Sequence, residues 1–198
     1  WRWGLPSGSD KGSARARGSY KTLASLGLSS LRLKSLTQSS HSGSNGHAVM
    51  TGYRDEKKKT AIRERFDRLA EDREYWQGKG SYYYQDQQRY YRFLIPDGLR
   101  VLEIGCGLGD LLAAVKPSRG LGIDVSEVMV AAASRRHPSL EFRTCDVDAL
   151  DLGETFDVII LADVLGHFLD VESVLKRLRS VCTSKTRIVI SYYNFLWE

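Results

Sequence analysis

The sequence predicts an α/β fold in which a doubly wound, mainly parallel sheet carries helices on both faces. From residue 99 onward, short continuous apolar stretches alternate with helical stretches. Strands that are buried on both faces have this pattern, which is typical of parallel sheets. A glycine-rich loop, "GCGLGD", follows the first apolar stretch. Parallel sheets of this type bind ligands beyond the carboxyl ends of their strands, so the loop marks the expected site.

Five strands and three helices are expected in this part of the chain. The predicted strands are "RVLEI" (100–104), "GLGID" (120–124), "LEFRTC" (140–145), "FDVIILAD" (156–163) and "TRIVISYY" (186–193). The predicted helices are "GDLLAAVK" (109–116), "SEVMVAAASRR" (126–136) and "DVESVLKRLRSVC" (170–182). Ser126 is a suitable N-cap for the second helix. We assign residues 99–198 to this α/β domain.

Two further segments precede the α/β domain. Residues 49–98 are predicted to form a helical cap. In it, Ile62, Phe66, Leu69 and Ala70 form an amphipathic stripe, "GKGS" breaks the helix, and a tyrosine-rich second helix ends at the "PDG" turn. Residues 1–48 are rich in Ser, Gly and Arg and have no consistent periodicity, so we expect a disordered extension. That extension is compatible with a transit peptide or with a non-native terminus.

Composition excludes several classes of protein. The net charge is +5, but the basic excess lies in residues 1–48, so the folded part is close to neutral and no nucleic-acid partner is expected. No apolar run is long enough to span a membrane. The three cysteines form no CxxC pair, so neither a disulfide framework nor a metal site is expected, and a cytoplasmic location fits best. The oligomeric state stays open.

The glycine loop suits two kinds of nucleoside cofactor. Gly105 allows a sharp turn after the strand, and Gly107 leaves room for a ligand against the main chain. A dinucleotide site has G-x-G-x-x-G/A, whereas here the sixth position is Asp110. An acid would repel a pyrophosphate but would tolerate a cofactor with an ammonium and a sulfonium. Glu103 and Asp110 bracket the loop and therefore favour the second kind.

Two more carboxylates follow predicted strands. Asp124 ends the second strand and can accept hydrogen bonds from both ribose hydroxyls, a requirement that both kinds of cofactor share. Asp146 follows the third strand and can accept from an adenine amino group, with the Val147 backbone at the edge of the ring. A structural interpretation of Asp146 as a turn former stays open.

Residues 99–194 resemble the class I S-adenosylmethionine-dependent methyltransferases, in the subgroup that acts on small molecules. The stretches that carry the resemblance are "VLEIGCGLGDLL", "GIDVSEVM", "CDVDAL" and "FDVIILADVLGH". The resemblance implies a seven-stranded Rossmann-like sheet and S-adenosylmethionine (SAM) as cofactor. The sequence departs from the family after the fifth predicted strand, so we expect the C-terminal strands to be missing. The resemblance implies these contacts: Gly105, Cys106 and Gly107 with the methionine part, Asp124 with the ribose, Val125, Met129, Asp146 and Val147 with adenine, and Asp163 near the methionine end.

Methyl transfer from a sulfonium needs positioning and, for a protonated acceptor, a general base. His167 is the candidate base, although a capping or structural role stays open. Tyrosines at 82–84 and 90–91 are candidates for a lid, and Tyr192, Tyr193 and Asn194 for the acceptor side. Cys106 and Cys145 have no base nearby in the sequence, so we expect no nucleophilic role.

The sequence therefore predicts a SAM-dependent methyltransferase that acts on a small-molecule or lipid-linked acceptor. Two alternatives stay open: an NAD(P)-dependent oxidoreductase and a cofactor-binding scaffold without turnover.

Overall fold

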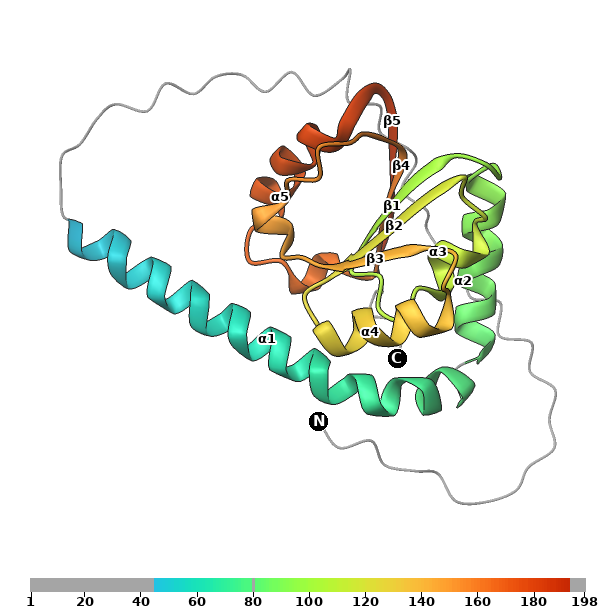
Figure 1. Cartoon of the computed structure of the whole chain (residues 1–198). Coiled ribbons are helices and arrows are strands. Elements are labelled where there is room, and N and C mark those ends of the chain that lie inside the picture. The colour runs from blue at the N-terminus through green and yellow to red at the C-terminus, as the bar shows by residue number, and fades with distance from the viewer. Residues whose placement is uncertain (1–44, 80, 193–198) are drawn as a thin grey trace.

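A parallel sheet organises the chain, and its strand order is β3-β2-β1-β4-β5 (Figure 1). The computed structural model describes residues 45–79 and 81–192. The strands are β1 (Arg100–Ile104), β2 (Arg119–Asp124), β3 (Glu141–Thr144), β4 (Phe156–Ala162) and β5 (Cys182–Ser191). β1 is central, and the chain runs outward from it in one direction through β2 and β3 and in the other through β4 and β5. The order therefore reverses at the carboxyl ends of β1 and β4, where such sheets bind ligands.

Alternate residues of each strand enter different core layers. Val101, Val158 and Ile160 face α2 (Ser81–Leu94) and α3 (Asp110–Ala114). On the other face, Leu102 and Ile159 pack against α5 (Val171–Arg177) and the 3₁₀ turn η4 (Leu178–Val181). Both faces of the sheet are covered, which explains why its strands are continuous apolar runs. The predicted α/β class and doubly wound sheet are confirmed.

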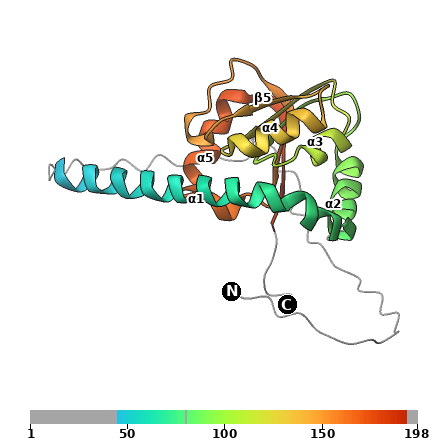
Figure 2. The same ribbon diagram turned by 60° about the horizontal axis from the view of Figure 1, so that its bottom comes forward.

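The remaining helical segments are α4, α1 and two short 3₁₀ turns. α4 (Glu127–Arg136) begins at Ser126, whose hydroxyl accepts a hydrogen bond from Met129 N–H, so the predicted N-cap is confirmed. Short 3₁₀ turns η2 (Val147–Ala149) and η3 (Leu165–His167) follow β3 and β4. The long helix α1 (Asn45–Lys79) crosses beside α4, and its first turns extend away from the α/β body (Figure 2).

Several boundaries differ from the predicted ones. α1 begins at Asn45, so its first turn includes residues 45–48, which the sequence placed in the extension. α3 has only 5 residues, and the last predicted helix divides into α5 and η4. In α2, Tyr83 and Tyr91 face inward but Tyr90 is exposed. The predicted disordered segment up to residue 44, and Tyr193 and Asn194, lie outside the described residues.

Within the described residues, we find no helix with the length and apolar character that crossing a membrane requires.

Replacing Gly122 of β2 by Ala tests how tightly the sheet packs behind the glycine loop. A Cβ at Gly122 would lie 2.6 Å from Phe142 and 2.9 Å from the Cys106 Cβ. We expect the free energy of unfolding to fall by about 1–3 kcal/mol, the usual cost of overpacking. Urea-induced unfolding measures the change. Gly166→Ala is the matched control, because its added Cβ meets nothing closer than 3.8 Å. Equal stabilities of the two variants would contradict this account.

Candidate functional site

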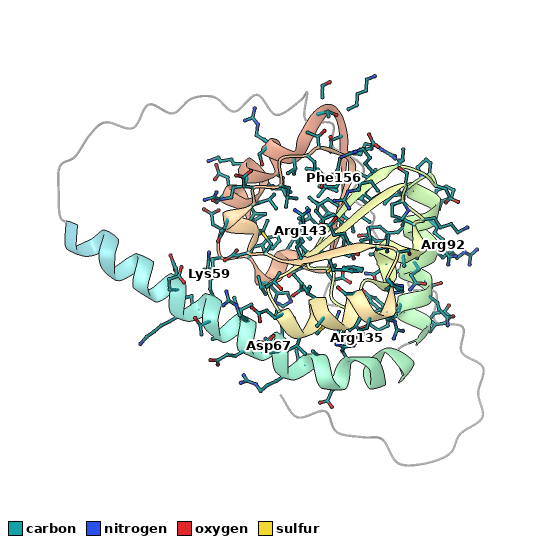
Figure 3. All side chains as sticks on the ribbon, in the orientation of Figure 1. Lys59, Asp67, Arg92, Arg135, Arg143 and Phe156 are labelled. Carbon is teal, nitrogen blue, oxygen red and sulfur yellow. The ribbon has the colours of Figure 1, made fainter. Side chains whose placement is uncertain are left out.

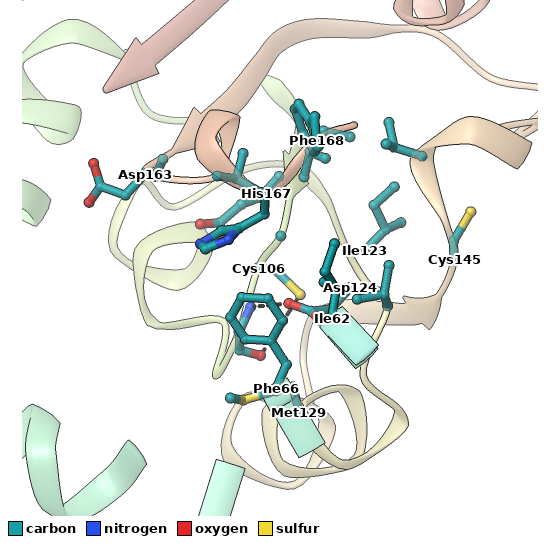
Figure 4. Close-up of a pocket in the computed structure, with 18 of the residues that line it drawn as sticks. Ile62, Phe66, Cys106, Ile123, Asp124, Met129, Cys145, Asp163, His167 and Phe168 are labelled. Carbon is teal, nitrogen blue, oxygen red and sulfur yellow. Dashed lines mark hydrogen bonds between the residues drawn. The ribbon is translucent and has the colours of Figure 1, made fainter. Parts of the chain in front are cut away.

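A cavity of about 310 Å³ opens at the carboxyl ends of β1, β2, β3 and β4. The glycine loop after β1 forms its floor, and side chains of α1 and η3 lie across it (Figure 4). The predicted general base and every predicted cofactor-contacting residue line this cavity: Glu103, Gly105, Cys106, Gly107, Asp124, Val125, Met129, Asp146, Val147, Asp163 and His167. The fold thus brings together residues from four strand ends, although their individual roles stay predictions.

The backbone of the glycine loop is bonded within the protein. Gly105, Gly107 and Gly109 have φ values of +71°, +51° and +76°, which only glycine adopts without strain. The N–H groups of Gly105 and Cys106 both donate to Ile123 O, and Gly109 N–H donates to Cys106 O. A pyrophosphate binds to free N–H groups of such a loop. These donors are occupied here, so the loop favours a ligand without phosphates.

Asp124 ties the glycine loop to the end of β2. Its Oδ2 accepts a hydrogen bond from Gly107 N–H at 2.9 Å, and its Oδ1 accepts from Ser126 N–H at 3.0 Å. Burial raises the pKa of Asp124, and these backbone hydrogen bonds oppose that rise. An ionised carboxylate has about four lone-pair positions, so acceptor capacity remains for two hydroxyl groups of a ligand.

The structure corrects the interpretation of Glu103 and Asp110 as free negative charges beside the loop. Glu103 is buried, and burial raises its pKa to about 8, so the carboxyl is largely protonated at neutral pH. The Asp110 carboxylate pairs with Arg136 Nε at 2.6 Å and with His137 Nε2 at 2.8 Å. Neither acid therefore presents an unpaired negative charge to the loop. The occupied N–H donors, rather than these two acids, now disfavour a pyrophosphate.

At the β3 end of the cavity, Asp146 caps η2. Its Oδ1 accepts from Asp148 N–H at 2.9 Å, and its Oδ2 lies 2.9 Å from Lys59 Nζ of α1. Burial alone would raise the pKa of Asp146, but the hydrogen bonds from Lys59 and Asp148 outweigh it and lower that pKa. Asp146 is therefore both a turn former, as the structural alternative proposed, and an ionised acceptor beside the cavity.

Asp163 lies at the opposite end of the cavity from Cys145 (Figure 4). It follows β4 with φ +56°, a left-handed conformation that is uncommon for a residue other than glycine. Its carboxylate accepts hydrogen bonds from Tyr83 Oη, from Gln87 Nε2 at 2.8 Å and from Ser191 Oγ at 3.0 Å. Of the predicted lid tyrosines, Tyr83 and Tyr84 line the cavity, Tyr82 and Tyr90 are exposed, and Tyr91 is buried between α2 and the sheet. Tyr192, a candidate for the acceptor side, is exposed and does not line the cavity.

α1 contributes a row of side chains that were not predicted as site residues. Phe66 packs edge-on against His167, with ring centroids 4.9 Å apart, and Asp67 accepts a hydrogen bond from Ser126 Oγ at 2.5 Å. Figure 3 labels Lys59 and Asp67 on this helix. Arg73 lies over the glycine loop, and its Nε is buried without a hydrogen-bond partner among the described residues. The stripe Ile62, Phe66 and Ala70 indicated the buried face, but not what it would cover.

His167 and two cysteines complete the lining. Burial lowers the pKa of the partly exposed His167 below 6.5, and Arg65 and Arg73 lower it further, so the imidazole is neutral at pH 7. Burial raises the pKa of Cys106 and of Cys145, which keeps both thiols protonated. In the described part of the chain, no group of three His, Cys, Asp or Glu side chains is arranged to hold a metal ion.

A parallel sheet with a glycine loop after β1 and a carboxylate after β2 defines a nucleoside-cofactor-binding α/β domain. Comparison with known proteins makes the class specific. Residues 102–188 match the family model for a methyltransferase domain. Ubiquinone biosynthesis O-methyltransferase of Bradyrhizobium diazoefficiens is 33% identical over 107 residues, which are 51% of this chain and 42% of that protein. The protein of that name from Rhodopseudomonas palustris strain TIE-1 is 31% identical over 108 residues, 52% of this chain and 43% of that protein.

A solved structure shares the fold. Magnesium protoporphyrin IX methyltransferase from Synechocystis PCC 6803 with bound SAM gives a TM-score of 0.54 at 25% identity, covering 70% of this chain and 77% of that one. Residues 102–188 are therefore similar to methyltransferase domains, the class of protein that the sequence motifs predicted. The match covers less than half the length of the curated relatives.

The raised pKa of Glu103 predicts how the free energy of unfolding depends on pH. The folded carboxyl titrates near 8 and the unfolded one near 4.5, so the native state holds an extra proton between these values. This contribution is complete below about pH 4.5 and is lost as pH rises through 8. We expect the unfolding free energy of the wild type, relative to Glu103→Gln, to fall over this interval and then level off. Urea unfolding of both proteins across pH measures it, and a pH-independent difference would contradict the assignment.

Proposed function

We propose that this protein is a SAM-dependent methyltransferase that acts on a small-molecule or lipid-linked acceptor. The observation that carries the proposal is the bonded glycine loop beside Asp124: it offers a nucleoside a carboxylate but offers a pyrophosphate few free N–H groups. The methyltransferase family match supports it. The same observation argues against the NAD(P)-dependent alternative.

We assign the lining residues to successive parts of SAM. Asp124 would hold the ribose hydroxyls, Val125 and Met129 would flank the adenine, and Asp146 with Val147 would recognise its edge. Gly105, Cys106 and Gly107 would lie along the methionine part, with Asp163 near its ammonium. Glu103 would support this site from below, because its carboxyl accepts Leu112 N–H at 3.0 Å and so fixes the start of α3.

Arg73 adds a partner for the carboxylate of the methionine part. A Cβ built on Gly107 would lie 3.5 Å from Arg73 Nη2, so the guanidinium lies within van der Waals contact distance of the loop. Its Nε is buried without a hydrogen-bond partner in the described residues, an arrangement that costs free energy until an acceptor arrives. A ligand carboxylate would supply that acceptor and suit the guanidinium fork.

Catalysis would need little from the protein beyond positioning. Bound SAM supplies a methyl group already activated by its sulfonium. His167 would take the proton from an acceptor hydroxyl, because its lowered pKa leaves the imidazole free to accept at neutral pH. Phe66 would orient that ring through their edge-on contact, and α1 would keep water from the cavity.

The acceptor that we propose is an acidic hydroxyl on a small molecule, such as a phenol. The lining near His167 includes Phe66 and Phe168, an apolar and aromatic surface (Figure 4). The names of the O-methyltransferase relatives support an oxygen acceptor.

Three free thiols among the described residues support a reducing compartment such as the cytoplasm. We further propose that residues 49–98 form a helical cap and that residues 99–198 form the cofactor-binding domain.

Calorimetric titration tests the cofactor. We expect SAM and S-adenosylhomocysteine (SAH) to bind and NAD not to bind. Asp124→Asn is expected to weaken SAH binding about 10- to 150-fold, the range for hydrogen bonds to a charged group. Asp151→Asn is the matched control, because Asp151 is exposed and outside the cavity lining. NAD binding, or full affinity in Asp124→Asn, would refute the assignment.

His167→Gln tests turnover against the scaffold alternative. Because the pKa of His167 lies below 6.5, we expect kcat/KM for a phenolic acceptor to fall only as pH drops below that value. The variant should lose this acid limb and about 100- to 10,000-fold in kcat, the usual contribution of a general base, with SAH affinity unchanged. Activity assays against a panel of phenols measure it. Undiminished turnover would exclude the general-base role, and no turnover in the wild type would favour a scaffold.

A further inference from the structure

Lys59 of α1 binds two carboxylates at the β3 end of the cavity. Its Nζ lies 2.9 Å from Asp146 Oδ2 and 2.6 Å from Asp148 Oδ2, and all three side chains are partly buried and line the cavity. Lys59 reaches these residues from the helical cap, far away in the sequence. Figure 3 shows Lys59 on the long helix α1.

The contact fixes Asp146 in one orientation. Asp148 N–H holds Oδ1 at 2.9 Å, and the Lys59 ammonium holds Oδ2, so neither oxygen is free to turn away. Lys59 also compensates the repulsion between the two neighbouring carboxylates. Because an ionised carboxylate has about four lone-pair positions, Asp146 can still accept another hydrogen bond on its cavity side. Without Lys59, two like charges would adjoin and Asp146 would lose one of its two fixed contacts.

We propose that Lys59 is a positioning residue for base recognition: it orients Asp146 to accept the amino group of adenine, which makes α1 part of the cofactor's specificity. The proposal rests on the proposed function, since it assumes that the cavity binds SAM. Lys59 touches Asp146 rather than the base. It therefore acts only while α1 lies against the α/β body, where Asp67 also bonds to Ser126 at 2.5 Å.

Two neighbouring cations of α1 serve as controls, because they carry a positive charge near Asp146 but form no ion pair with its carboxylate among the described residues. Arg63, one turn along α1, lines the cavity but forms no ion pair within 4 Å among the described residues. Lys58 is exposed and lies outside the cavity lining. Removing either charge changes the field around Asp146 without removing a contact to its carboxylate. Of these three cations, Lys59 is the one that combines the charge with a hydrogen bond to Asp146.

The test compares SAH with S-inosylhomocysteine, which has a carbonyl where adenine has its amino group. Calorimetry gives both dissociation constants for wild type, Lys59→Met, Lys59→Arg and the control Lys58→Met. We expect the wild type to prefer SAH, and Lys59→Met to lose about tenfold in that preference by weakening SAH more than the inosine analogue. Lys59→Arg should restore most of the preference, because a guanidinium keeps both charge and donors. Lys58→Met should match the wild type.

The preference between the two ligands is the readout that a merely structural role would not change. Equal weakening of both ligands in Lys59→Met, or unchanged preference, would overturn the positioning role while leaving the cofactor assignment intact. A wild type that binds neither ligand would instead overturn the proposed function itself. Circular dichroism of each variant before titration ensures that only folded protein is compared.

Discussion

The two hydrogen bonds of the Asp124 carboxylate hold the candidate site together. Through Gly107 N–H and Ser126 N–H, this side chain joins the loop after β1 to the start of α4. Ser126 in turn caps α4 and donates to Asp67 of α1. The glycine loop, which is the floor of the cavity, is thereby linked to α1, which we call its roof. A loop with three left-handed glycines has many conformations available. The buried carboxylate selects the one in which the loop follows the cavity wall.

The roof itself depends on polar contacts more than on apolar packing. α1 touches the α/β body through Lys59, Asp67, Phe66 and Arg73. Among the α1 residues whose burial the structure describes, only Ala70 belongs to a buried apolar cluster. Ion pairs and hydrogen bonds at a partly exposed surface contribute little net free energy each. The sheet, by contrast, is anchored by two layers of buried aliphatic side chains. Most of the apolar stabilisation among the described residues therefore comes from the sheet and the helices packed on it.

The strands and the ligand-binding edge of the sheet could be predicted from local sequence, whereas the contacts that α1 makes over the cavity could not. Continuous apolar runs and the placing of Gly105, Asp124 and Asp146 at strand ends define the sheet and its ligand edge without any knowledge of long-range contacts. Lys59 and Arg73 are ordinary surface residues by sequence, because their partners lie in other elements of the fold. Glu103 was interpreted as a charge beside the loop, yet burial protonates it. Pairing and desolvation depend on the tertiary structure, so these features required it.

Two thiols border a space where an alkylating sulfonium is proposed to sit, which poses a problem of self-modification. A thiolate is a far better nucleophile than a thiol, and one beside an activated methyl group would capture it. Cys106 and Cys145 are kept in the thiol form, since burial in a region of nearby carboxyl groups raises the pKa of each. The two thiols in the cavity lining would therefore react slowly with the sulfonium, and its methyl group would be preserved for an incoming substrate.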